Sequence, residues 1–180
     1  MQTFINYENK RDRMVEAVGK DMLIREVPLF KVKYSDVFHL KNLYVMMHEY
    51  LAEEGWTGSG GSGASPNDTH SDIEKMYMER HHQKALHRGG TEIWLWWRLK
   101  KQPYTKLQGY YEYRLEIDFH GMYLQKIEIM HQGKKLKVDK GEMEIFFHPK
   151  IVRTPMGKKW QKHWILKWFW EMYEKRILEH

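Results

Sequence analysis

Acid–base side chains recur at every second position in one short segment: Glu116, Asp118 and His120. Alternate side chains of an extended strand point to the same face, so these three groups would line one face and could exchange protons with a substrate. Ordinary cross-strand ion pairs explain the same charges more simply, for example Glu116 with Lys126. We therefore assign no catalytic residues and favour a protein that is not an enzyme, with an enzyme kept as an alternative.

Metal binding is the second chemistry to consider, because histidines and a glutamate gather in one short stretch. They are Glu79, His81, His82 and His87. In a strand, His81 and His82 would point to opposite faces, and on a helix His82 and His87 would lie far apart around its axis. The chain has no cysteine, which removes thiolate ligands and a thiolate nucleophile. We predict no metal ion and no cofactor.

Two tryptophans share one face of a predicted strand with basic residues. This candidate surface-binding set is Trp94, Trp96, Arg98 and Lys100, with Arg114 as the expected neighbour on the next strand. Tryptophan beside cations offers a stacking surface for bases or sugars, so nucleic acid is one partner that the sequence allows. The alternative is that residues 1–27 or a second copy of the chain covers these tryptophans, as core or as a homodimer contact.

The net charge of +6 is concentrated at the C-terminal end of the sequence. Residues 150–177 carry eight basic side chains and two acidic ones, which leaves the rest of the chain with 22 of each. The pI near 9.3 therefore reports one basic segment and is a weak reason to expect nucleic acid. No segment resembles a signal peptide or is long and apolar enough to span a bilayer. We expect a cytoplasmic protein without a membrane span.

A Trp-rich segment, KKWQKHWILKWFWEMY, places four tryptophans in eleven positions. Its apolar residues recur at helical spacing over well more than half of the helix circumference. Such a helix is expected to be buried rather than to lie on a membrane, because membrane-surface helices have a broad polar face. We predict that Trp164, Trp168 and Phe169 are buried against a sheet. The narrow polar stripe, with Lys167 and Glu171, is expected to be exposed.

The remaining patterns predict the elements that would position these residues. Residues 36–54 fit an amphipathic helix, preceded by an alternating strand at 28–34. Residues 57–68 fit a flexible Gly/Ser-rich linker, which resembles an engineered one. Residues 71–83 fit either a helix or a strand, and we favour a strand because a Gly-Gly pair and a strong strand follow. Two alternating strands are predicted next, at 92–100 and 110–119.

Three predicted turns extend the sheet into an antiparallel meander. Gln132-Gly133 and Lys140-Gly141 fit two-residue hairpin turns, and His120-Gly121-Met122 fits a three-residue loop. The resulting register puts four apolar residues in one row across the strands: Leu115, Ile127, Val138 and Met143. On the other face the charges alternate across the strands, in the order Arg114, Glu128, Lys137 and Glu144. A shift of one residue would move every side chain to the other face.

Together these elements predict an α+β fold, in which a curved antiparallel meander of about six strands packs on a long C-terminal helix. One further helix lies at about 36–54. We expect this helix-grip-like topology to form a single domain over residues 1–177. Residues 178–180 resemble the start of an expression tag.

The favoured function is a non-enzymatic binding module that holds a small apolar or aromatic ligand between the sheet and the C-terminal helix. The predicted pocket residues are Trp97, Tyr113, Trp164 and Trp168. The first alternative is a nucleic-acid-binding protein that uses the Trp94 and Trp96 face and the basic C-terminal region. The second is an enzyme whose catalytic residues the sequence does not identify, since a fold does not fix a function.

Overall fold

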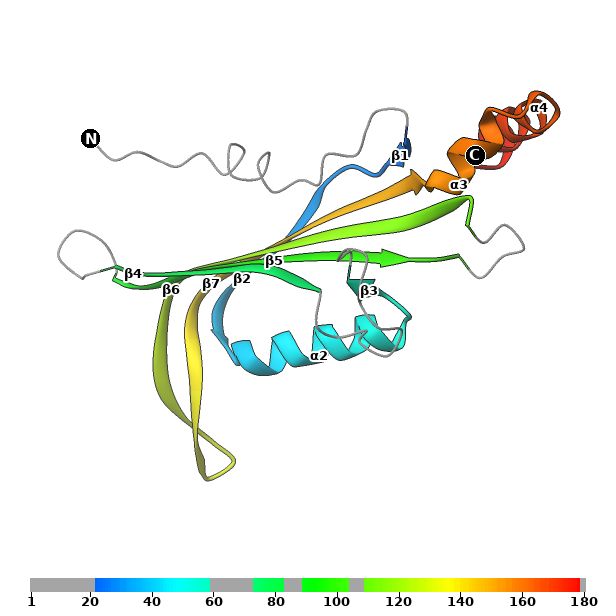
Figure 1. The fold of residues 1–180 in the computed structure, drawn as a ribbon. Helices are drawn as coiled ribbons and strands as arrows, with labels where there is room; N and C mark the ends of the chain where they lie inside the picture. The colour runs from blue at the N-terminus through cyan, green and yellow to red at the C-terminus, as the bar shows by residue number, and fades with distance from the viewer. Residues whose placement is uncertain (1–21, 59–72, 83–88, 104–108, 179–180) are drawn as a thin grey trace, which may run out of the picture.

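The computed structural model describes residues 22–58, 73–82, 89–103 and 109–178. A seven-stranded antiparallel sheet has one helix on its lower face and two helices beyond one end (Figure 1). The strands are β1 (Leu23–Glu26), β2 (Phe30–Phe38), β3 (Thr57–Gly58), β4 (Glu74–His82), β5 (Gly90–Lys101), β6 (Tyr111–His131) and β7 (Lys134–Arg153). The helices are α2 (Leu40–Glu53), α3 (Pro155–Gln161) and α4 (Trp164–Tyr173), which continues into the π-helix η1 (Glu174–Leu178). The predicted α+β class and antiparallel sheet are confirmed.

The three long strands form the centre of the sheet in the order β5–β6–β7. Four short strands share its two edges. β1 and β2 pair with successive parts of β7, and β3 and β4 pair with successive parts of β5. The favoured strand at 71–83 is present as β4. Of the predicted linker at 57–68, Thr57 and Gly58 form β3, and the remainder lies outside the described residues.

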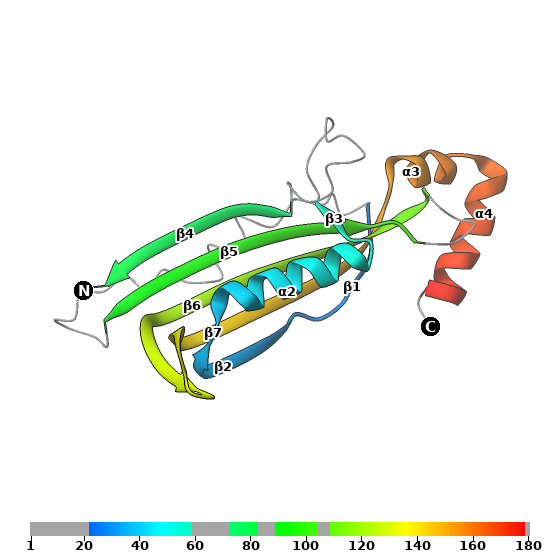
Figure 2. The same cartoon turned by 90° about the horizontal axis from the view of Figure 1, so that it is seen from below.

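Helix α2 packs across one face of the sheet and forms the main core with it (Figure 2). The alternation of β5 directs Leu95, Trp97 and Leu99 to this face, as the sequence predicts. The other buried residues of this core are Leu51, Ile73, Ile93, Ile117, Phe119, Leu124, Met143 and Ile145. The helix that the sheet covers is therefore α2 and not the C-terminal helix.

Helix α2 begins four residues later than predicted. Residues 36–38 continue β2 and pair with β7, which satisfies their backbone groups in the sheet. His39 then caps the helix, because its Nδ1 accepts a hydrogen bond from the backbone N–H of Asn42 at 3.3 Å. The backbone N–H of Leu40 donates to Asp139 of β7 at 3.2 Å, which joins the start of the helix to the sheet.

Two glycines that the sequence analysis assigned to turns lie inside long strands instead. β6 continues through Gly121 and β7 continues through Gly141, so the predicted loop at 120–122 and turn at 140–141 are wrong. Opposite Gly141, β6 carries two residues, Tyr123 and Leu124, which form a β-bulge. The side chain of Leu124 lies across both glycines. A Cβ added at Gly121 would be 2.9 Å from this side chain, and one added at Gly141 would be 2.8 Å from it. Glycine is needed here because side chains approach the backbone closely.

The remaining predicted turn, at Gln132-Gly133, is confirmed. Both residues have positive φ, 49° and 76°, as a two-residue hairpin of this kind requires. The register near the turn is also confirmed, with Glu128 opposite Lys137. Farther from the turn it is wrong, because four predicted strands are two continuous ones. Arg114 lies opposite Lys150, and not opposite Glu128.

The C-terminal helices lie beyond the end of the sheet and do not pack across its face (Figure 1). Thr154 caps α3, accepting a hydrogen bond from the Gly157 backbone N–H at 3.1 Å, and Pro155 occupies the first helical position. The predicted burial of Trp164, Trp168 and Phe169 is wrong, since they are 82%, 63% and 53% exposed. The predicted exposure of Lys167 and Glu171 is confirmed. No helix in the described part of the chain is long and apolar enough to cross a membrane.

Candidate functional site

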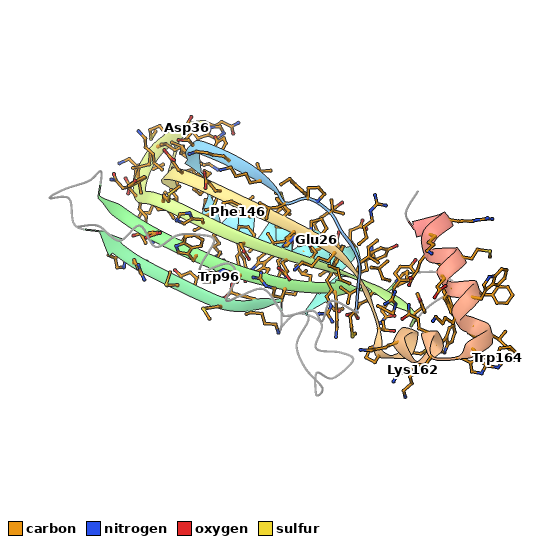
Figure 3. All side chains as sticks on the ribbon, turned by 90° about the horizontal axis from the view of Figure 1, so that it is seen from above. Glu26, Asp36, Trp96, Phe146, Lys162 and Trp164 are labelled. Carbon is orange, nitrogen blue, oxygen red and sulfur yellow. The ribbon has the colours of Figure 1, made fainter. Side chains whose placement is uncertain are left out.

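The predicted stacking surface lies on the sheet face opposite α2. Trp94, Trp96 and Arg98 share this face, as predicted, but they are only 5%, 3% and 4% exposed. Trp94 and Trp96 stack on each other with ring centroids 5.7 Å apart. Figure 3 shows this face, with Trp96 and Phe146 over its central strands. Bases or sugars could not stack on two indoles that are already buried.

The other two residues of that set are less buried and lie farther along the strands. Lys100 is directly opposite Arg114, so the expected neighbourhood is confirmed, and Lys150 lies opposite Arg114 on the next strand. The guanidinium of Arg114 binds Glu112 of its own strand, with Nη2 2.7 Å from Oε1. Three basic residues therefore share one row, and two of them pair with carboxylates, Arg114 with Glu112 and Lys150 with Glu116.

Buried ion pairs fill the middle of this face. Arg98 Nη1 lies 2.6 Å from Asp118 Oδ1, and Lys150 Nζ lies 2.8 Å from Glu116 Oε1. All four side chains are less than a tenth exposed. Glu116 therefore pairs with Lys150, and the Lys126 partner predicted from the sequence is wrong. A buried charge without its partner would be strongly destabilising, so these pairs hold the register of the sheet.

Two histidines on the same face also lie beside carboxylates. The imidazole of His148 lies between two carboxylates, with Nδ1 3.6 Å from Glu116 and Nε2 in contact with Glu26 of β1. His120 packs flat on Trp94, with ring centroids 3.7 Å apart. Its Nε2 lies 2.9 Å from Glu92 Oε1, which also accepts a hydrogen bond from the Trp94 indole.

The acid–base residues found in the sequence thus have structural partners. Glu116, Asp118 and His120 do share one face, yet they contact three different partners and do not converge on one another. The sequence analysis missed Lys150 and His148. In the segment HPKIVR, His148 and Lys150 alternate with other residues, which places both on one face of a strand. Their partners are distant in the chain, so the sequence did not reveal the pairing. In the part of the chain that the structure describes, these acid–base side chains pair with separate partners within the sheet and do not form one catalytic group.

The histidine cluster considered for metal binding is only partly described. His81 Nε2 lies 3.3 Å from Glu79 Oε1, and its Nδ1 lies 3.0 Å from the hydroxyl of Thr91. His87 and the side chain of His82 lie outside the described residues. Within the described ranges, no three histidine, aspartate or glutamate side chains are grouped as metal ligands.

The four predicted pocket residues are not brought together. Trp97 lies in the main core, with its ring edge-on to Tyr44 of α2 at 5.0 Å. Tyr113 lies in a second, smaller core at the end of the sheet. Trp164 and Trp168 are exposed on α4.

The second core joins α4 to the sheet through its inward side chains. Trp170 stacks on Tyr110 with ring centroids 3.8 Å apart, and Leu166 and Tyr173 pack beside it. Glu174 accepts two short hydrogen bonds, each of 2.6 Å, from the hydroxyl of Tyr110 and from Arg153. Burial, together with the Glu174 carboxylate, raises the pKa of Tyr110 to about 12.

The opposite side of α4 presents a continuous apolar surface, which we call the outward face. It consists of Trp164, Ile165, Trp168, Phe169 and Met172, all of which are exposed. At helical spacing these five residues cover adjacent positions around the helix. An exposed apolar patch bordered by polar residues usually marks an interaction site.

Basic side chains lie on α4 and on the segments that directly precede and follow it. They are Lys158, Lys159, Lys162, Lys167, Lys175 and Arg176. Figure 3 places Lys162 and Trp164 together at the end of the molecule that is farthest from Asp36. Comparison of the chain with protein families, with curated proteins and with solved structures finds no match. The candidate site therefore rests on its own chemistry.

Proposed function

We propose that this protein is a non-enzymatic binding module that binds the interfacial region of a lipid bilayer through the outward face of α4. The observation that supports the proposal is the exposure of three large aromatic side chains in a row, led by Trp164 at 82%. Tryptophan is enriched where membranes meet water, because its indole is apolar on its faces and polar at its N–H.

The shape of the outward face favours a bilayer over a small ligand. Sites for small molecules are concave and enclose most of the ligand surface. A helix face is convex and encloses nothing, whereas a bilayer interface accepts a helix that lies in its plane. The ligand predicted between sheet and helix is not part of this proposal, because Tyr110 and Trp170 fill that contact with their own rings.

The rest of the molecule explains why a membrane helix would lack the broad polar face expected from the sequence. The apolar side chains of α4 form three columns along the helix: Trp164, Trp168 and Met172; Ile165 and Phe169; and Leu166, Trp170 and Tyr173. The third column packs on the sheet. The sheet therefore covers the side that would otherwise need to be polar. Insertion of Trp164, Trp168 and Phe169 would contribute about 1.5–3 kcal/mol for each side chain that becomes fully buried.

Vesicle flotation tests the proposal. A variant with Trp164→Ser and Trp168→Ser should keep its melting temperature and lose its vesicle binding, because both indoles are exposed in the free protein. The matched control is Met46→Ser with Tyr50→Ser on the exposed side of α2, where the two side chains are 61% and 62% exposed. This control should bind vesicles like the unchanged protein. Equal loss of binding in both variants, or no vesicle binding at all, would overturn the proposal.

A further inference from the structure

We infer that the bilayer bound by α4 is an anionic one, an inference that rests on the proposed function. Six basic side chains precede, accompany or follow α4 along the chain, and five of them are exposed while Lys158 is half-buried. Lys158, Lys159 and Lys162 precede α4, Lys167 lies on its exposed polar stripe, and Lys175 and Arg176 follow it. Cationic side chains next to an inserted apolar face are typical of helices that bind acidic lipids.

Internal pairing removes one of the two acidic side chains from this surface. The carboxylate of Glu174 is turned toward the sheet, where Arg153 and the Tyr110 hydroxyl each lie 2.6 Å away. Glu171 remains on the exposed side, 3.8 Å from Lys167. The outward surface is therefore more positive than the sequence composition of α4 and η1 implies.

The length of the lysine side chain suits this arrangement. Lysine stems can lie along an apolar layer while their ammonium groups reach the lipid phosphates and carboxylates. Lys162 and Lys167 would take this position on either side of Trp164. Aromatic insertion and charge attraction then act on the same short segment, and the strength of binding at a bilayer interface depends on both.

The same charges argue against a second copy of the chain as the partner. In a twofold-symmetric contact the outward face would meet itself, so six basic side chains would face six others. Like charges brought together in this way oppose association. The side chains between the tryptophans also argue against nucleic acid as the partner. Ile165 lies between Trp164 and Trp168, and Met172 follows them on the same face. Both are exposed, and neither offers a ring on which a base could stack.

Flotation with vesicles of two compositions tests this inference. One set contains only phosphatidylcholine, and the other contains phosphatidylcholine with phosphatidylserine. We expect at least roughly hundredfold stronger binding to the anionic set at about 0.1 M salt, with most of the difference lost at about 1 M. The variant Lys158→Gln, Lys159→Gln, Lys162→Gln should lose roughly hundredfold, since each cation near an anionic surface contributes about fivefold.

The control carries the same charge change at the other end of the molecule. Lys134→Gln, Lys135→Gln, Lys137→Gln alters the β6–β7 hairpin, which Figure 1 shows at the opposite end of the sheet from α4. It should weaken anionic binding by no more than about threefold. Equal loss in both triple variants would overturn the inference, because net charge alone would then explain binding.

The remaining outcomes separate this inference from the proposed function. Equal binding to neutral and anionic vesicles would overturn the requirement for anionic lipid and leave bilayer binding in place. Failure to bind either set would overturn both. A single-stranded oligonucleotide is included as a competitor. If it binds more tightly than anionic vesicles and protects the Trp164 indole, the partner is nucleic acid and both proposals are wrong. Formation of dimers that bury the outward face would likewise contradict both.

Discussion

The indole of Trp170 lies flat on the phenol ring of Tyr110, with ring centroids 3.8 Å apart and ring planes within 8° of parallel. This contact selects which side of α4 meets the sheet. Because Trp170 and Trp168 are two residues apart on a helix, their side chains point to nearly opposite sides. Packing of Trp170 therefore forces Trp168 outward.

Replacement of Trp170 should destabilise the protein far more than replacement of Trp168. Trp170→Ala removes a 7%-exposed indole from the second core and should cost about 3–5 kcal/mol of the free energy that holds α4 on the sheet. Trp168→Ala removes an exposed side chain and should change the free energy of unfolding by no more than about 0.5 kcal/mol. Urea unfolding measures both values, and hydrogen exchange of the α4 amides locates the effect. A larger loss for Trp168→Ala than for Trp170→Ala would show that α4 packs through its other side.

The buried charges of Glu116 and Lys150 should each be tolerated only while the other is present. Glu116→Gln leaves the Lys150 ammonium buried without its carboxylate and should cost about 3–5 kcal/mol. Adding Lys150→Met removes the stranded charge, so the double variant should regain more than half of that loss. Urea unfolding of the single and double variants forms a complete cycle. Strictly additive losses would mean that the two groups do not interact.

The sequence was sufficient where the decisive contacts are local. The alternation of residues 92–100 correctly placed Leu95, Trp97 and Leu99 on the core face, because a strand has only two faces. The Gln132-Gly133 turn was found for a similar reason. Both of its residues need positive φ, and the chain there offers glycine at the second position.

The sequence failed where a distant part of the chain decides. A glycine that permits a turn and a glycine that lies beneath a crossing side chain look the same locally, and it is the close approach of Leu124 and the Met122 carbonyl that distinguishes them at Gly141. In α4, three apolar columns cover most of the circumference. The sheet offers partners for just one of them, mainly Tyr110, Tyr111 and Ile151. Sequence periodicity reveals the columns but not which of them is buried.

In the candidate site, too, the sequence predicted what local pattern decides and missed what distant contacts decide. Trp94, Trp96 and Arg98 were correctly assigned to one face, but their burial was not foreseen. The carboxylates and imidazoles that complete that face come from β1, β6 and β7, and from Glu92 of β5 itself. The outward face of α4 was visible in the sequence as a set of apolar residues and became a candidate surface only once its exposure was known.

Alkaline pH should destabilise the protein through its tyrosines. The pKa of Tyr110 is raised to about 12 by burial and by the Glu174 carboxylate, against about 10 in an unfolded chain. The folded state therefore binds this proton more tightly, so its contribution is complete below about pH 10 and is lost as the pH rises toward 12. In Tyr110→Phe, the decrease in the free energy of unfolding over this range should be smaller. The measurement is urea unfolding at several alkaline pH values.

Tyr44 provides the internal comparison for this pH dependence. Its pKa is also raised to about 12, by burial and by a hydrogen bond to Glu74, so Tyr44→Phe should reduce the alkaline loss in the same direction. The remaining tyrosines leave some loss in either single variant. An unchanged pH dependence in Tyr110→Phe would mean that its hydroxyl is not buried beside Glu174.

Asparagine and alanine substitutions at two glycines should distinguish a close approach from a turn. At Gly141 an added Cβ would lie 2.8 Å from both Leu124 Cδ2 and the Met122 carbonyl oxygen, so Gly141→Ala should cost about 1–3 kcal/mol. Gly141→Asn should cost more, because its side chain is larger. Gly133 has a φ of 76° and nothing within 4 Å of an added Cβ, so only backbone strain opposes substitution there. Gly133→Ala should cost about 1–2 kcal/mol and Gly133→Asn less, since asparagine tolerates this conformation. If asparagine were tolerated better than alanine at Gly141 as well, that residue would lie in a turn, and the continuous strand β7 would be wrong.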